Sequence, residues 1–261
     1  MVSTAKSQNP QLGNSVKKVK ISEIQRLRAL YLQEHNCQIR YDAAHGRGRT
    51  DSYLLLNDGT PVGYASVKGQ EVADRDTIFE FYLVPHFRQL ASRFYSELIA
   101  KARPTYLESQ TNDALTTAML YEFGQNISTD TILFCDFATT KLSVPGAILR
   151  PRKEDDGIFE HGLEPVGSYV VEMAGEVVAT GGFLTHYNPP FADLYMEVRE
   201  DRRRQGLGSL LLQHLKMACY EAGHVPAARC QIQNKASYAS LLRAGLRVCA
   251  HMLLARPKTL A

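Results

Sequence analysis

The strongest constraint on the fold is an internal repeat that spans most of the chain. Two β-rich runs flank a tight turn at residues 52–67, and the same pattern returns at residues 168–183. The turn glycines of these two hairpins, Gly59 and Gly175, are 116 residues apart. A chain of 261 residues has room for two domains of ordinary size. We therefore predict one α/β unit used twice.

The elements after each hairpin follow the same order: a strand, a helix, and a second helix that ends at a glycine. They are predicted at residues 79–84, 92–102 and 112–124 in the first half, and at residues 193–198, 208–221 and 234–245 in the second. The alternative is that two unrelated α/β domains share this common order. Pro145-Gly146 and the charged stretch after it interrupt the pattern. We predict a flexible segment at 1–20, one domain at 21–140 and another at 145–261.

Composition limits the class of protein. A hydrophobic content of 44% with 22% charged residues is typical of a soluble globular chain. A net charge of +3 excludes a protein that coats nucleic acid along its whole length. The N-terminus lacks an apolar signal segment, and no stretch is apolar for long enough to cross a membrane. Five scattered cysteines without a C-x-x-C pair predict a reducing cytoplasm and neither a disulfide framework nor a zinc knuckle.

The most informative stretch, residues 198–209, joins the second predicted strand to its helix. It contains four arginines within six residues, and Gly206 and Gly208 stand at the helix start. Free N–H groups and the positive end of the helix dipole favour an anion there, and glycine lets the backbone approach it closely. The P-loop ending Gly-Lys-Ser/Thr and the third glycine of a dinucleotide fingerprint are both absent. The alternative is a plain turn with solvated arginines.

The pattern Arg203-x-x-Gly206-x-Gly208 after a strand ending at valine resembles the pyrophosphate loop of the GNAT superfamily of N-acetyltransferases. The resemblance covers the second half of the chain, and the block from His186 to Cys249 also resembles a bacterial group of two-domain acetyltransferases. It implies an α/β (α+β) chain of two GNAT-like domains, each a mixed, mostly antiparallel twisted sheet flanked by helices.

The resemblance also implies acetyl-CoA as the acyl donor and no metal. In the superfamily, an asparagine at the start of the last helix contacts the pantetheine arm, and Asn234 matches it, although an asparagine there is more often a helix cap. The residues assigned to acyl-CoA binding are Val198, Arg203, Arg204, Gln205, Gly206, Leu207, Gly208, Ser209, Asn234 and Ser237.

The first half differs from the second at the loop. Where the second half has its two loop glycines, the aligned first half has Ser92 and Phe94. A phenylalanine at a position where the backbone must touch a phosphate closes the site. We therefore predict a degenerate first half that is structural or covers the substrate cleft, and one acyl-CoA per chain.

The resemblance implies an N-acetyltransferase that transfers an acetyl group from acetyl-CoA to a primary amine of a small molecule, amino acid or peptide. The amine attacks directly in a ternary complex, with N–H groups at the end of the Val198 strand polarising the thioester carbonyl. Relatives often carry the base four or six residues before the valine, where this chain has Leu194 and Ala192. The remaining candidates are Glu197, which strand alternation places on the opposite face, and His186, which could equally be an exposed loop histidine.

Two other classes of function stay open. The usual tyrosine that protonates the leaving thiolate is replaced by Leu241, with Tyr238 as a substitute that would more often pack. This favours a non-catalytic acyl-CoA-binding sensor or regulatory module as the alternative. Nucleic-acid binding through the arginine cluster lacks aromatic interleaving and is not favoured. The predicted partner is an amine acceptor, not a nucleic acid or a membrane, and a homodimer stays open.

Overall fold

The computed structural model describes residues 13–36, 38, 41–71, 73–162 and 164–259. The first half contains β1 (Asn14–Val19), α1 (Ile21–Glu34), α2 (Tyr41–Gly46), β2 (Thr50–Asn57), β3 (Thr60–Lys68), β4 (Thr77–Leu83), a 3₁₀ helix (Pro85–Leu90), α3 (Ala91–Ala102), β5 (Tyr106–Gln110), α4 (Ala114–Phe123) and β6 (Gly124–Asp136). The second half contains β7 (Ala147–Pro151), β8 (Tyr169–Met173), β9 (Glu176–Leu184), β10 (Phe191–Val198), a 3₁₀ turn (Glu200–Arg202), α5 (Leu207–Glu221), β11 (Val225–Gln231), α6 (Lys235–Arg243) and β12 (Leu246–Pro257).

The two halves share one sheet. Among the described residues, twelve strands follow the order β1-β2-β3-β4-β5-β12-β6-β11-β10-β9-β8-β7. The order is symmetric about the β12–β6 pair, and each half contributes one parallel pair, β4 with β5 and β10 with β11, to an otherwise antiparallel sheet. This confirms the predicted fold class and the repeat.

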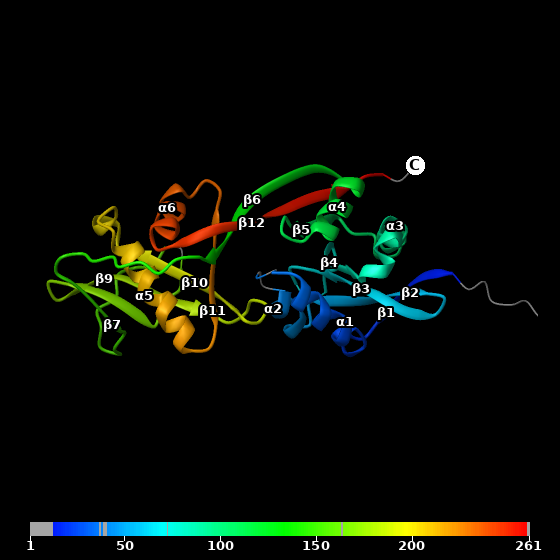
Figure 1. Cartoon of the computed structure of the whole chain (residues 1–261). Coiled ribbons are helices and arrows are strands. Elements are labelled where there is room, and N and C mark those ends of the chain that lie inside the picture. The colour runs from blue at the N-terminus through cyan, green and yellow to red at the C-terminus, as the bar shows by residue number, and fades with distance from the viewer. Residues whose placement is uncertain (1–12, 37, 39–40, 72, 163, 260–261) are drawn as a thin grey trace, which may run out of the picture.

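The last strand of each half completes the sheet of the other half. β6 pairs with β11 of the second half, and β12 pairs with β5 of the first. Figure 1 shows these two long strands running between the two lobes. The core beneath α3 and α4 includes Leu253 of β12, and the core beneath α5 and α6 includes Phe134 of β6. Neither lobe therefore has a complete core made from its own half of the sequence.

The hairpin turns that defined the repeat have the same backbone. Asp58 and Gly59 have φ of 48° and 77°, and Ala174 and Gly175 have φ of 51° and 83°. Two successive positive φ angles are the geometry that closes a two-residue hairpin with the right twist. The predicted hairpins, strands and helices of both halves are all present within a few residues.

The face opposite α3–α6 is covered differently in the two halves. In the first half α1 packs there, with Ile24 and Tyr31 against Tyr64 and Tyr82. The second half has no helix between β7 and β8 in its described residues, and an irregular loop takes that place. Residues 14–19, expected within a flexible segment, instead form β1 along the edge of β2. Residues 1–12 lie outside the described part of the chain, and the predicted boundary at 140–145 falls in the segment between β6 and β7.

Candidate active site

The candidate site lies where the parallel strands of the second half separate. β10 and β11 pair only from Phe191 to Asp193, opposite Val225 to Ala227. Beyond this point β11 continues along β6 while β10 continues along β9. A cavity of about 480 Å³ lies at this divergence, lined by residues of both strands and of the start of α6. An extended ligand can therefore enter between two strands without breaking a sheet ladder.

Backbone donors of β10 point into this gap. The Arg199 N–H donates to the Val178 carbonyl of β9 at 2.9 Å. Since successive residues of a strand direct their N–H groups to opposite edges, the Val198 N–H points to the edge from which β11 has diverged. A donor in that position suits a polarised carbonyl oxygen.

The loop that enters α5 has the backbone expected of an anion site. Arg204 and Gly206 have φ of 64° and 84°, and Gly206 caps the helix from the left-handed region, which favours glycine. A Cβ on Gly208 would lie 3.0 Å from Met196 Cε, so this glycine lets α5 pack closely on β10. The first N–H groups of α5, from Leu207 to Ser209, have no partner within the helix. The loop therefore presents donors where the sequence predicted them.

The structure separates the four arginines into two kinds. Arg199 pairs with Glu176 and Asp201, and Arg202 also pairs with Asp201, so local carboxylates balance these two charges. Arg203 and Arg204 are exposed on the loop, and Arg203 Nε donates to the Val198 carbonyl at 3.2 Å. Only the second pair therefore remains available to a phosphate.

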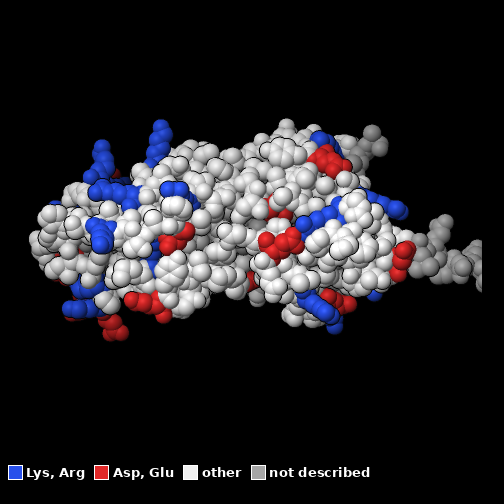
Figure 2. Space-filling view, in the orientation of Figure 1, with Lys and Arg blue, Asp and Glu red and all other residues white. Residues whose placement is uncertain are grey.

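Sequence reasoning missed another cation at the loop. Arg243, exposed at the end of α6, has its Nη1 only 3.5 Å from the position of a Cβ on Gly206. The residue lies almost forty positions along the chain from the loop, so only the packing of α6 beside α5 brings it there. Figure 2 shows basic side chains gathered over this part of the second lobe.

The residues predicted to bind the pantetheine arm lie on the cavity wall. Asn234 and Ser237 both line the cavity, and Asn234 also caps α6 by accepting the Ser237 N–H at 3.0 Å. Cys230 lines it too, but burial raises the pKa of its thiol, which disfavours the thiolate. Leu241 is buried in the core, and Tyr238 packs against Phe134. The structure therefore offers no helix tyrosine as an acid at this wall.

Acidic groups line the cavity on the side away from α5. Asp193 lies at the vertex of the divergence, with its Oδ2 at 3.4 Å from Arg229 Nε and 3.7 Å from His186 Nε2. The predicted base His186 is thus beside a cavity-lining carboxylate. Glu164 also lines the cavity. The residue is exposed, but partial desolvation of its carboxyl raises its pKa, with Arg229 acting against the rise and Glu197 adding to it.

Glu197, the other predicted base, is hydrogen-bonded to the loop that precedes β8. Its carboxylate accepts the N–H of Gly162 at 3.0 Å and of Glu164 at 2.9 Å, and its Oε2 lies 3.6 Å from His161 Nδ1. The side chain is nearly buried. Glu197 therefore fixes the backbone of Glu164, a cavity-lining carboxyl that sequence reasoning overlooked because it is distant in sequence from the strand.

The corresponding region of the first half is closed. The predicted alignment of Phe94 with Gly208 is two residues out, because α3 is capped by Leu90 where α5 is capped by Gly206; Ser92 therefore stands at the place of Gly208, and Phe94 is buried as Leu210 is. In β4 the first half has Glu80, which corresponds to Tyr195 of β10 and is fully buried on the face of α1. Arg28 donates two hydrogen bonds to Glu80 Oε1, of 3.0 and 3.1 Å, and His45 and Tyr64 contact its Oε2.

This buried cluster reaches the second half. Arg28 Nη2 donates to Asn188 Oδ1 at 3.2 Å, and Asn188 is fully buried in the loop that precedes β10. Tyr187 of the same loop packs against Phe79 of β4. His186 directly precedes Tyr187 in this loop. The first half therefore contacts the segment that borders the candidate site.

The comparisons with known proteins agree with this geometry. Residues 136–246 match the acetyltransferase (GNAT) family. No curated protein is significantly similar to the chain in sequence. An acetyltransferase of the GNAT family from Colwellia psychrerythraea has a similar structure, with a TM-score of 0.69 and 13% identity over 94% of this chain and all of that one. The family match therefore covers the part of the sequence that carries the candidate site.

Two further solved structures are similar to this chain over nearly their whole length. A tandem GNAT protein from the clavulanic acid biosynthesis pathway gives a TM-score of 0.53 at 12% identity, over 95% of this chain and all of that one. A GCN5-related N-acetyltransferase from Sphaerobacter thermophilus gives 0.54 at 13% identity, over 94% and 97%. At these identities the likeness concerns the fold, and the chain has the tandem GNAT fold. No helix within the described residues is long and apolar enough to span a membrane.

Proposed function

We propose that the chain is an acetyl-CoA-dependent N-acetyltransferase whose single acyl-CoA site is in the second half. The observation that carries this is the strand divergence after Asp193, with its cavity of about 480 Å³, beside a glycine-capped helix start. Exposed Arg203, Arg204 and Arg243 suit the phosphates, and Asn234 and Ser237 suit the pantetheine amides.

The residues present fit a bound acetyl-CoA. Acetyl-CoA would supply the thioester whose C–S bond breaks as the C–N bond to the amine forms. The Val198 N–H is directed at the gap in which the carbonyl oxygen would gain charge. The acceptor amine would enter from the side away from α5, where Asp193 and Glu164 attract a cation. This agrees with an ammonium-bearing small molecule, amino acid or peptide.

Glu164 is the group that we assign to accept the proton of the amine. A base must be ionised to act, and a carboxyl with a raised pKa holds a proton more strongly than an ordinary one. Because partial desolvation raises the pKa of Glu164, it should set an acid limb of the pH–rate profile above the range of an ordinary glutamate. In this assignment Glu197 positions the loop, and His186 with Asp193 binds the acceptor.

The primary test is release of CoA thiol during incubation with acetyl-CoA and a panel of primary amines, together with calorimetry of acetyl-CoA binding. We expect turnover on at least one amine and a stoichiometry of one per chain. Saturable binding without turnover on any amine would instead support the acyl-CoA sensor, for which the buried Leu241 is the favouring observation. A stoichiometry of two would contradict the closed first half.

The assignment of Glu164 has its own test. Glu164→Gln should lower kcat by about a hundredfold and remove the acid limb of the pH profile, because general-base catalysis contributes about that much. Glu160→Gln is the matched control, since Glu160 is an exposed glutamate of the same loop. An unchanged profile in Glu164→Gln would show that another group takes the proton.

A further inference from the structure

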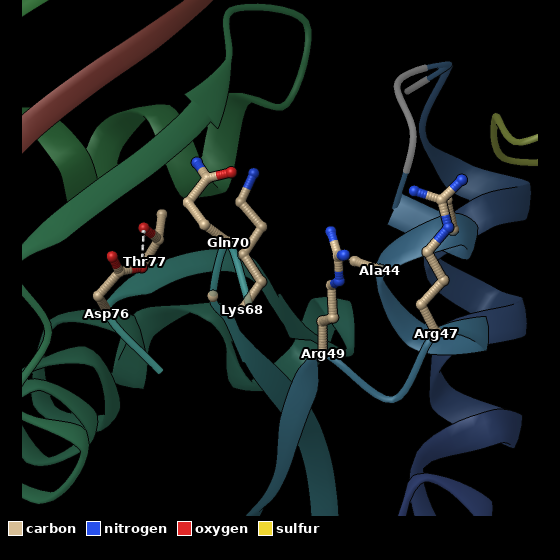
Figure 3. A pocket seen from close by; sticks show the side chains of 9 residues that line it. Ala44, Arg47, Arg49, Lys68, Gln70, Asp76 and Thr77 are labelled. Atoms are coloured by element: carbon tan, nitrogen blue, oxygen red, sulfur yellow. Dashed lines mark hydrogen bonds between the residues drawn. The ribbon is translucent and has the colours of Figure 1, made fainter. Parts of the chain in front are cut away.

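We propose that the first half has an anion site of its own, unrelated to acyl-CoA, which binds a compact divalent oxyanion of the phosphate class. The site is a cavity of about 150 Å³ between α2, the start of β2 and the β3–β4 connection. Three cationic side chains from these segments line it: Arg47, Arg49 and Lys68. Figure 3 shows all three extending to the same side, with Gln70 beside Lys68.

Two of these cations have no counter-charge among the described residues. Within the described part of the chain, neither Arg47 nor Arg49 forms an ion pair, and the Nε of Arg49 is a buried donor without a hydrogen-bond partner. A buried guanidinium donor without a partner calls for an external acceptor, because leaving it unsatisfied is unfavourable. Two unpaired guanidiniums match a ligand with two negative charges and several acceptor oxygens.

Of the other two charges of the pocket, one is paired within the protein and one lies at its far end. Lys68 Nζ lies 2.6 Å from Glu108 Oε1, so its charge is balanced within the protein. Asp76 accepts a hydrogen bond from the Thr77 hydroxyl at 2.7 Å. Figure 3 shows Asp76 and Thr77 at the end of the pocket away from Arg47. The carboxylate therefore leaves the guanidinium end open to an anion.

The backbone holds the two arginines in fixed positions. The N–H groups of Arg47 and Arg49 donate to the carbonyls of Ala43 and Ala44 at 3.1 and 3.0 Å, with Gly48 between them at φ of 66°. The Arg49 carbonyl in turn accepts the Gly69 N–H at 3.1 Å. Because the backbone is already fixed, only the side-chain rotamers of the two arginines have to be ordered when an anion binds.

The test is calorimetry with inorganic phosphate at low, matched ionic strength. It uses a chain carrying Arg203→Gln and Arg204→Gln, which removes the exposed loop cations of the second half. We expect saturable binding of one phosphate per chain. Adding Arg49→Gln should weaken it at least about tenfold, since a hydrogen bond between charged groups contributes about 1.5–3 kcal/mol. Arg93→Gln, an exposed arginine of α3, is the matched control and should change nothing.

One further variant and one further ligand test whether the loss of phosphate binding is specific. Arg49→Lys keeps the positive charge but loses the planar guanidinium with its paired donors. It should therefore retain part of the phosphate affinity, which separates a loss of binding from a loss of folding. Acetate should bind more weakly than phosphate, because it carries one charge. Equal phosphate affinity in Arg49→Gln and Arg93→Gln, no saturable binding, or equal affinity for acetate would each overturn the proposal. None of these results depends on acetyl-CoA binding.

Discussion

The two halves differ in the strand that leads to the helix and at the start of that helix. Counted from the equivalent hairpin turns, Glu80 of β4 corresponds to Tyr195 of β10. Leu90 caps α3 where Gly206 caps α5, and Ser92 stands where α5 has Gly208. The first half thus has a buried strand carboxylate and no glycine at its helix start, whereas the second half has both glycines.

The carboxylate of the first half is no longer suited to chemistry. Glu80 has no exposed surface, and Arg28, His45 and Tyr64 occupy its oxygens. Through Arg28 it is linked to Asn188 of the second half. A buried strand carboxylate of the first half therefore supports the loop beside the site of the second.

The largest effect is expected when the buried cluster around Glu80 is broken. Burial alone would raise the pKa of Glu80, but the charges and hydrogen bonds of Arg28 and His45 outweigh it and lower the pKa from 4.5 to about 2. Its ionised form therefore contributes stability above pH 4.5 that is lost as the pH falls towards 2. Glu80→Gln should lower the free energy of unfolding at neutral pH by about 3 kcal/mol.

Urea unfolding across the acid range measures this change. The variant should also show a flatter loss of stability between pH 4.5 and 2 than the unmodified chain does. Glu221→Gln, an exposed glutamate at the end of α5, serves as the control. If the two variants prove equally stable, the buried cluster does not hold the halves together.

The next largest effect should follow from filling the space that a glycine leaves at the start of α5. Gly208→Phe places a ring where even a Cβ would lie 3.0 Å from Met196 Cε. Overpacking of this kind should weaken acetyl-CoA binding about a hundredfold in calorimetry. Gly208→Ala should be mild, because it meets only the flexible end of Met196. A folded Gly208→Phe chain with normal affinity would show that acetyl-CoA binding does not need the close packing of α5 at this glycine.

A smaller effect is expected from backbone conformation alone. Gly206→Ala adds a Cβ with no contact below 3.5 Å but forces alanine to a φ of 84°. The strain of about 1–2 kcal/mol should weaken acetyl-CoA binding about tenfold. Gly175→Ala is a close control, since Gly175 has a φ of 83° and open space around it in a distant turn. Equal affinity in both variants would remove the special role of the loop backbone.

The smallest effect concerns the cation contributed by α6. Arg243→Gln should weaken acetyl-CoA binding about threefold at low ionic strength, because an exposed charge interaction contributes up to about 1 kcal/mol. The difference should shrink as salt is added. Arg26→Gln, exposed on α1, provides the control for net charge. A salt-independent difference would point to altered packing instead.

The sequence predicted most of the local structure correctly. Gly59 and Gly175 marked both hairpin turns, and Gly206 and Gly208 marked the start of α5, because these positions constrain the backbone directly. Strand alternation also placed Glu197 on the face away from Leu194, as the structure has it. Such features depend on neighbours in the chain, so a single sequence is enough to find them.

The long-range contacts were beyond prediction. The periodicity of β6 and β12 indicates strands but does not say which half each completes, since a strand can pair equally well with either sheet edge. Arg243 reached the loop, and Asn188 reached Arg28, only through that exchange and the packing of α6. The sequence by itself determined the repeated unit, through the spacing of its apolar residues and its turn glycines. It also determined which half has glycines at the start of its helix. Only the tertiary structure decided that the halves share one sheet and that Glu164 faces the cavity, because pairing and burial join residues far apart in the chain.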